Sequence, residues 1–154
     1  MNSDQILRRE QRLDGTPEEV FAFFADAHNL EALTPPLLRF RVITPAPIRM
    51  GAGTLIRYEL RVRRVPVSWL TEITTWDPPH RFVDEQIKGP YALWHHTHTF
   101  EPIGDGDTLM RDVVRYRIGF GPLGSLANRL VVRRDVERIF EFRAQRIPAL
   151  LAAA

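Results

Sequence analysis

The sequence predicts an α+β domain in which a curved antiparallel sheet of about seven strands packs against one long C-terminal helix. Through the middle of the chain, hydrophobic side chains alternate with polar ones between short turns, which indicates antiparallel neighbouring strands. After Gly119 the spacing changes to three and four residues, as in Val132, Val136 and Phe140. This spacing predicts a helix that begins near Leu123. At ~1.5 Å per residue the helix spans about 35 Å, enough to cross the sheet diagonally.

The N-terminal part of the chain predicts one strand and two short helices. Residues 5–13 have strand character, although both faces carry charge. Residues 16–19 read Thr-Pro-Glu-Glu, which combines a capping threonine, a proline at the first helical position and a glutamate at the third. We expect Asp26 to cap a second short helix over residues 28–33, which the prolines after Thr34 terminate.

The remaining strands follow from alternation with a period of two. Phe40 and Val42 begin this pattern, and a proline-rich turn follows. The later predicted strands cover residues 56–62, 65–73, 81–88, 93–101 and 107–118. Turn sequences separate the last four at Asp77-Pro78-Pro79, Gly89-Pro90 and Gly104-Asp105-Gly106.

Composition indicates one ordinary globular domain over residues 1–154, with 44% hydrophobic and 26% charged residues. The chain has no cysteine, which excludes disulfides and thiolate chemistry. No leader-like segment or run of about 18 apolar residues occurs, so we expect a cytoplasmic protein without stable membrane insertion. The net charge of +2 comes from scattered arginines, which argues against nucleic-acid binding.

The order of elements and several segments resemble one superfamily. The segments are Phe82–Gln86, Gly89–Tyr91, Trp94–Phe100, Gly119–Gly124 and Ile139–Arg143. They are similar to those of the START-like, or SRPBCC, superfamily, which has the helix-grip fold, and in particular to bacterial ligand-binding proteins related to polyketide cyclases and dehydratases.

This resemblance implies a cavity between the sheet and the long helix, closed at one end by the short helices. Such a cavity holds a small hydrophobic or amphipathic molecule between apolar walls and a few polar groups. On this basis the expected ligand-binding residues are Tyr58, Trp69, Asp84, Gln86, Trp94, Phe100, Val114 and Phe140. The resemblance implies no cofactor.

Polar side chains share faces with the apolar ones on three predicted strands. His96 and His98 alternate with Trp94 and Phe100, while Asp112 and Tyr116 alternate with Val114 in the same way. Periodicity does not orient the strand 81–88. Its Phe82 face carries Asp84 and Gln86, its other face carries Val83, Glu85 and Ile87, and the resemblance places Asp84 and Gln86 inward.

Three interpretations of these polar groups stay open. They can form a structural network that satisfies itself inside the sheet. Alternatively, they fix one end of a mostly apolar ligand. In the third interpretation His96 or His98 moves a proton and an aspartate such as Asp112 holds the histidine. Tyr58 or Tyr116 then polarises a carbonyl oxygen.

The sequence His96-Thr97-His98 also raises the question of a metal. Two histidines one residue apart on a strand point the same way, with roughly 7 Å between Cα atoms. Asp84 or Asp112 would supply a third ligand. A bare H-x-H motif is a weak signal, however, and the resembled superfamily is not generally metal-dependent. The sequence alone therefore leads us to expect no metal.

We accordingly expect a protein that binds a small hydrophobic ligand rather than an enzyme. The alternatives are a cofactor-independent cyclase or dehydratase acting on a polyketide-like substrate, and a protein-interaction module of the chaperone-activator type. The loop over residues 120–126 would border the cavity mouth. An open sheet edge near residues 39–45 would allow a homodimer, although its prolines oppose strand pairing.

Overall fold

A computed structural model describes residues 4–62, 64–119 and 126–154. Its elements in chain order are β1 (Gln5–Asp14), α1 (Pro17–Ala25), α2 (Asn29–Ala32), the 3₁₀ turn η1 (Pro36–Leu38), β2 (Arg41–Val42), β3 (Leu55–Val62), β4 (Val65–Asp77), β5 (Arg81–Lys88), β6 (Tyr91–Ile103), β7 (Asp107–Ile118) and α3 (Leu126–Ala152). This is the predicted helix-grip α+β fold. Within the described part of the chain, no helix is both long and apolar enough to cross a membrane.

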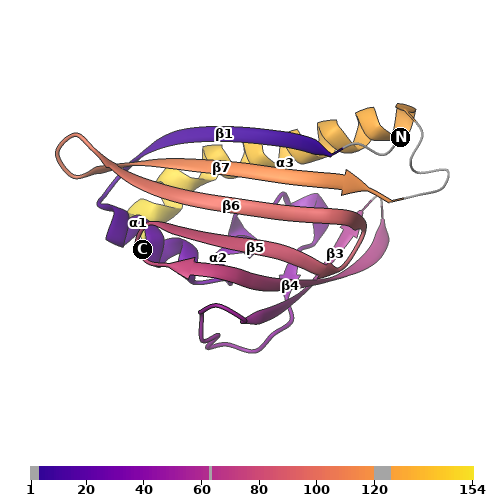
Figure 1. Cartoon of the computed structure of the whole chain (residues 1–154), viewed down its shortest axis with the longest axis horizontal. Coiled ribbons are helices and arrows are strands. Elements are labelled where there is room, and N and C mark those ends of the chain that lie inside the picture. The colour runs from indigo at the N-terminus through magenta and orange to yellow at the C-terminus, as the bar shows by residue number, and fades with distance from the viewer. Residues whose placement is uncertain (1–3, 63, 120–125) are drawn as a thin grey trace.

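The sheet has seven antiparallel strands in the order β1-β7-β6-β5-β4-β3-β2, and Figure 1 shows them curving around one side of the molecule. Consecutive strands from β2 to β7 are neighbours, whereas β1 pairs with β7, which brings the first strand beside the last. Register shifts interrupt the β4–β5 and β6–β7 pairings. Such irregularities bend a strand and increase its twist, which helps the sheet curl.

The helix α1 begins as its sequence predicts. The Thr16 side chain accepts a hydrogen bond from the Glu19 backbone N–H, while the Glu19 carboxylate accepts one from the Thr16 N–H. The four large apolar residues of α1, Val20, Phe21, Phe23 and Phe24, are all buried.

The start of α2 differs from the prediction. The helix has a single turn, and its N-cap position is His28, which makes no side-chain capping bond. Asp26 ends α1, and its carboxylate accepts a hydrogen bond from the backbone N–H of His28. An aspartate can satisfy a backbone N–H two residues ahead in a turn, and this local bond replaces the expected helix cap.

The predicted strand at residues 39–45 is also shorter than expected. Only Arg41 and Val42 pair with β3, which makes β2 a short edge strand. Arg39 adopts a positive φ of 45° at the end of η1, so the chain turns before it can extend.

The long helix α3 runs behind the sheet, and its C-terminal end lies near α1 (Figure 1). Gln11 of β1 donates a hydrogen bond of 2.8 Å from Nε2 to the Ala144 carbonyl, and Arg9 lies 3.6 Å from the Glu141 carboxylate. These contacts fasten the helix along the edge strand. The predicted start near Leu123 and most of the predicted mouth loop lie outside the described residues.

The buried apolar residues form two clusters. The larger one joins α1 to the sheet and includes Phe21, Phe82, Phe100 and Ile147 of α3. The smaller one contains Val114, Tyr116, Val136 and Phe140. The interior therefore has two apolar regions, both in contact with α3.

We predict that Ile147→Ala lowers the free energy of unfolding by about 2–5 kcal/mol, because it leaves a cavity at a fully buried position. Urea denaturation measures this change. Leu130→Ala, at a half-exposed position of the same helix, should change the free energy by less than about 0.5 kcal/mol. Equal losses in the two variants would show that α3 does not pack as described.

Candidate functional site

Four polar residues from three adjacent strands meet on the inner face of the sheet. We call Asp84 of β5, His96 and His98 of β6, and Asp112 of β7 the tetrad. In the strand register Asp84 lies opposite His96, and Asp112 lies opposite His98. Alternation along β6 directs both histidines to the same face. The structure thus places Asp84 inward, which periodicity alone left undecided.

The hydrogen bonds of the tetrad run diagonally across this register. His96 Nε2 lies 2.7 Å from Asp112 Oδ1, and His98 Nε2 lies 2.6 Å from Asp84 Oδ2. Each remaining ring nitrogen faces the other carboxylate, with His96 Nδ1 at 3.7 Å from Asp84 Oδ2 and His98 Nδ1 at 3.4 Å from Asp112 Oδ1. Each imidazole thus lies between the two carboxylates.

The imidazole rings are stacked and removed from solvent. Their centroids are 3.6 Å apart with 26° between the planes, and His96 and His98 are only 3% and 5% exposed. Phe82 stacks on His98 at 3.9 Å, while the edge of Phe140 approaches His96 at 5.3 Å. Since Phe82 and Phe140 belong to different apolar clusters, the tetrad is a polar layer between them.

The surroundings shift the pKa values of the two histidines in opposite directions. Burial and the neighbouring His98 charge lower the pKa of His96. Burial acts on His98 too, but its hydrogen bonds to Asp112 and Asp84 outweigh it and raise the pKa of His98. Burial opposes ionisation of both aspartates, yet the histidines hold the pKa of Asp84 and of Asp112 below the ordinary value. The tetrad therefore favours two carboxylates, one imidazolium and one neutral imidazole.

Arg143 of α3 adds a second positive charge to this interior. Its guanidinium lies 4.8 Å from the centre of the Phe140 ring and interacts with the charges of Asp112 and Asp84. Burial lowers the pKa of Arg143, although the two carboxylates oppose the shift. Its Nε is buried and has no hydrogen-bond partner within the described part of the chain.

Sequence reasoning missed Arg9 as a residue of this region. Arg9 lies opposite Asp112 in the β1–β7 register, and its Nε is also buried, with no hydrogen-bond partner in residues 4–62, 64–119 and 126–154. In the sequence, only the position of Arg9 on the same strand face as Leu7 and Leu13 indicated that it points inward. Because both faces of β1 carry charge, this pattern did not decide which face is buried.

Several predicted ligand-binding residues lie near the tetrad. Trp94 approaches His96 at 6.5 Å between ring centroids, and Trp69 packs edge-to-face on Trp94 at 5.2 Å. The indole Nε1 of Trp69 is buried, and none of the described residues accepts a hydrogen bond from it. Tyr58 shares a hydrogen bond with Thr71, and burial followed by the Asp84 charge raises its pKa. Val114 packs with Phe140 in the smaller cluster.

The other predicted site residues do not join the tetrad. Phe100 packs among phenylalanines in the larger cluster. Gln86 donates to the Tyr91 carbonyl and accepts from the Tyr91 N–H, which closes the β5–β6 turn. The Tyr116 ring contacts Tyr91 and Trp94, and no hydrogen bond among the described residues connects it to His96 or His98.

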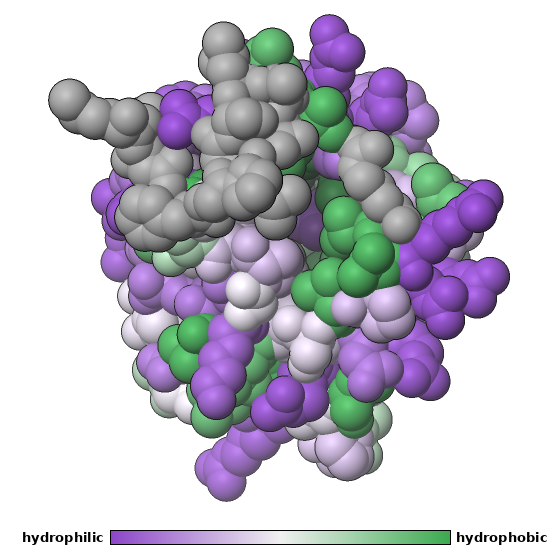
Figure 2. Space-filling model, turned by 90° about the vertical axis from the view of Figure 1, so that its right-hand side faces the viewer, coloured by the Kyte–Doolittle hydropathy of each residue, from purple (hydrophilic) through white to green (hydrophobic). Residues whose placement is uncertain are grey.

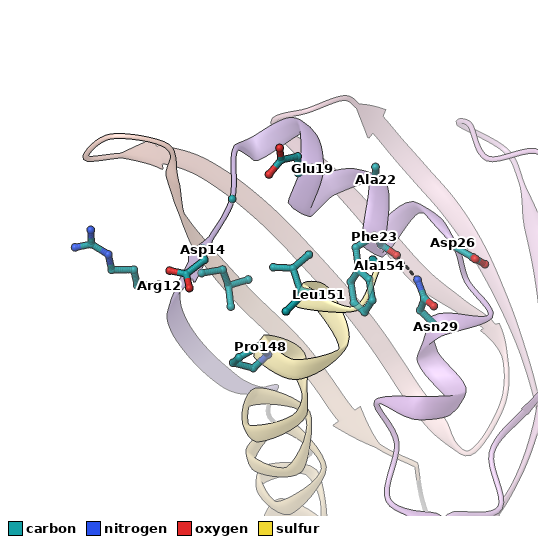
Figure 3. A pocket seen from close by; sticks show the side chains of 13 residues that line it. Arg12, Asp14, Glu19, Ala22, Phe23, Asp26, Asn29, Pro148, Leu151 and Ala154 are labelled. Carbon is teal, nitrogen blue, oxygen red and sulfur yellow. Dashed lines mark hydrogen bonds between the residues drawn. The ribbon is translucent and has the colours of Figure 1, made fainter.

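Two hollows accompany this arrangement. The smaller, about 210 Å³, lies between β1 and α3 and reaches Asp112, Phe140 and Arg143. The larger, about 940 Å³, lies at the C-terminal end of α3, where Figure 3 shows Leu151 and Phe23 facing each other from α3 and α1. The larger hollow does not include the tetrad. Figure 2 shows hydrophobic side chains on the end of the molecule where β6 begins.

Comparison with known proteins identifies the family. Residues 5–152 match the family described as "Polyketide cyclase / dehydrase and lipid transport". The chain belongs to this family. No curated protein matches the sequence. The START-like resemblance seen in the sequence is confirmed.

Solved structures of this fold cover nearly the whole chain. TTHA0849 from Thermus thermophilus has a TM-score of 0.73 and 24% identity, over 97% of this chain and 99% of its own. The Zhui aromatase/cyclase from Streptomyces sp. R1128 has a TM-score of 0.76 and 14% identity, over 97% of this chain and 94% of its own. Norcoclaurine synthase from Thalictrum flavum has a TM-score of 0.70 and 13% identity, over 99% of this chain and 97% of its own. At these identities the likeness shows the helix-grip fold alone.

We predict that, at a pH just above 6.5, His98 is protonated and His96 is neutral in this family member. The stability contributed by His98, whose pKa is raised, is present below its ordinary value of 6.5 and is lost as the pH rises through the folded value. For His96, with its lowered pKa, the contribution is present above 6.5 and is lost as the pH falls through the folded value.

Nuclear magnetic resonance of the ring nitrogens follows each histidine separately. Asp84→Asn should lower the pKa of His98, because it removes the carboxylate that makes the shorter contact with the charged ring, at 2.6 Å. His95→Gln, on the same strand but outside the tetrad, is the control. Two histidines that titrate together at 6.5 would contradict the described contacts.

Proposed function

We propose that the protein binds a small, largely apolar molecule whose oxygen atoms face the tetrad and Arg143. The observation that carries this proposal is the presence of two buried donors, Arg143 Nε and Trp69 Nε1, that have no hydrogen-bond partner among the residues the structure describes. A buried polar group without a hydrogen bond costs about 1–3 kcal/mol. A ligand that accepts hydrogen bonds from these groups would recover part of that free energy.

The surrounding side chains favour a flat ligand. The rings of Trp69, Tyr91 and Trp94 lie within 5.0–5.6 Å of one another, in edge-to-face and tilted arrangements. Aromatic side chains provide apolar contact area with specific geometry. The ligand class is therefore an aromatic or polyketide-like molecule with carbonyl or hydroxyl oxygens, which agrees with the family description.

Binding of such a molecule would require α3 to move away from the sheet. The hollow that reaches Asp112 and Arg143 holds about 210 Å³, less than the ~300–1,000 Å³ typical of ligand pockets. The polar contacts given above from β1 to α3 are one hydrogen bond to Ala144 and one exposed ion pair to Glu141. Exposed ion pairs contribute little, so an outward shift of the helix is the least costly way to enlarge the site.

We predict that the protein binds 2-acetyl-1-naphthol more tightly than naphthalene, and that Trp69→Phe weakens naphthol binding about 3–10-fold. The variant keeps an aromatic ring but loses the N–H donor, which is worth about 0.5–1.5 kcal/mol. Isothermal titration calorimetry measures both ligands. Trp76→Phe is the matched control because Trp76 packs on Phe21 and Phe82 in the larger cluster. Loss of naphthalene binding to the same extent would show that Trp69 acts only through its ring.

The opposite pKa directions of the stacked histidines favour a second candidate function, acid–base catalysis without a cofactor. Neighbouring groups whose pKa values are pushed apart are suited to act as base and acid. His96 Nε2–H can donate to Asp112, which leaves Nδ1 free to accept a proton. Protonated His98 can supply one.

These roles fit a ring closure of a polyketide-like β-dicarbonyl chain. His96 would take a proton from the carbon between two carbonyls, and the resulting enolate carbon would form a bond to a distant carbonyl carbon. That carbonyl oxygen would take the proton of His98 and become a hydroxyl group. Arg143 is better placed than Tyr116 to stabilise the enolate oxygen, because its charge acts on the tetrad.

We predict that His96→Gln reduces ring closure at least 100-fold while naphthol binding changes less than threefold, since general acid–base groups contribute typically 10²–10⁴-fold. Liquid chromatography with mass spectrometry follows a linear β-polyketone substrate. His95→Gln should retain turnover. Full turnover in both His96→Gln and Asp112→Asn would exclude this role for the tetrad.

A further inference from the structure

We infer that Asp84, His96 and His98 form a binding site for a divalent transition-metal ion, with Asp112 as the outer carboxylate that orients both histidines. One donor atom from each of the three ligand residues can be chosen such that all lie within 4.8 Å of one another. Two imidazole nitrogens and one carboxylate oxygen are a common donor set for Zn²⁺. This inference goes beyond the proposed function and does not depend on it.

The strongest support comes from the way the two carboxylates divide the ring nitrogens. Asp84 Oδ2 faces Nδ1 of His96 and Nε2 of His98, whereas Asp112 Oδ1 faces the other nitrogen of each ring. A histidine that binds a metal through one nitrogen usually donates its other N–H to a carboxylate, a carbonyl or water. Asp112 can accept from both rings, at 2.7 Å and 3.4 Å.

The ion would occupy the place of the proton between His98 and Asp84. The nitrogen–oxygen distances on that side are 2.6 Å and 3.7 Å, and ligands at ~2.0–2.1 Å from Zn²⁺ in a tetrahedral arrangement lie about 3.3 Å apart. Binding of the ion would shorten the distance from Asp84 Oδ2 to His96 Nδ1 and lengthen the distance from Asp84 Oδ2 to His98 Nε2, which brings both near this value. The rings must also rotate out of their 26° stack so that their lone pairs converge on the ion.

The charges of the surroundings admit a cation. With both imidazoles neutral, Asp84 and Asp112 contribute two negative charges and Arg143 contributes one positive charge. The net charge of −1 attracts a divalent ion, although Arg143 reduces the attraction. Approach is possible because the Asp84 side chain is 18% exposed.

This inference differs from the expectation drawn from the sequence, in which a bare H-x-H motif was too weak to predict a metal. The sequence shows two possible third ligands, Asp84 and Asp112, but not their different positions. The structure places one on each side of the stacked rings. Asp84 can therefore be assigned as the metal ligand and Asp112 as the acceptor that supports the two histidines.

The test is calorimetric titration of the metal-free protein with Zn²⁺ and, in parallel, with Co²⁺, whose visible spectrum reports its coordination. We expect one ion per chain. Asp84→Asn, His96→Gln and His98→Gln should each weaken binding at least 100-fold. Asp112→Asn should weaken it about 10–100-fold, as loss of a supporting carboxylate does. His95→Gln, on the neighbouring position of β6, and His80→Gln, outside the tetrad, should bind as the original protein does.

A second measurement needs no variant and so does not depend on how the variants fold. Nuclear magnetic resonance of the unaltered protein with Zn²⁺ should show metal at Nδ1 of His96 and Nε2 of His98, with protons on the opposite nitrogens. The inference is overturned if no ion binds at one per chain, if His95→Gln weakens binding as much as His96→Gln, or if the metal occupies the nitrogens that face Asp112. Naphthol binding by the metal-free protein is measured separately, so failure of one proposal is distinguishable from failure of the other.

Discussion

The interior of this protein depends on two diagonal hydrogen bonds, His96 to Asp112 and His98 to Asp84. An ionised group buried without a partner is strongly destabilising, by about 3–5 kcal/mol when one member of a buried pair is removed. The four side chains come from β5, β6 and β7, so they meet only in one register of the three strands. A slip of one residue would turn them to the outer face. The polar site and the central sheet therefore specify each other.

The position of α3 is coupled to this site through a charge. Arg143 brings a buried guanidinium toward two carboxylates, and Phe140, one turn earlier, contacts His96. Ile147 anchors the same helix in the larger apolar cluster. A displacement of α3 around Phe140 and Arg143 would thus change both the space beside the tetrad and its charge balance, while the turn that carries Ile147 stays anchored near α1. The two apolar clusters make such an uneven movement possible.

Much of the fold was predictable because it depends on local periodicity, but the site depends on relations between strands. Alternation placed His96 and His98 on one face, and Thr16 marked a helix start. Periodicity did not orient Asp84, whose strand has apolar residues on both faces. Diagonal pairing could not be foreseen because it depends on side-chain rotamers and on strand register. The error at Asp26 has a local cause, since a turn and a helix cap compete for the same carboxylate.

Charge balance determines what the tetrad can accept. The negative charges of Asp84 and Asp112 are balanced by Arg143 and by one imidazolium, so the buried cluster is neutral. The proton that makes one histidine an imidazolium resides mainly on His98. A neutral ligand leaves that balance unchanged and is admitted without titration. An anionic ligand would require the second imidazole to become charged, which burial opposes. A divalent cation would instead displace the proton. If the proposals hold, the same four side chains would thus favour uncharged oxygen-bearing molecules or a metal ion over free carboxylates and phosphates.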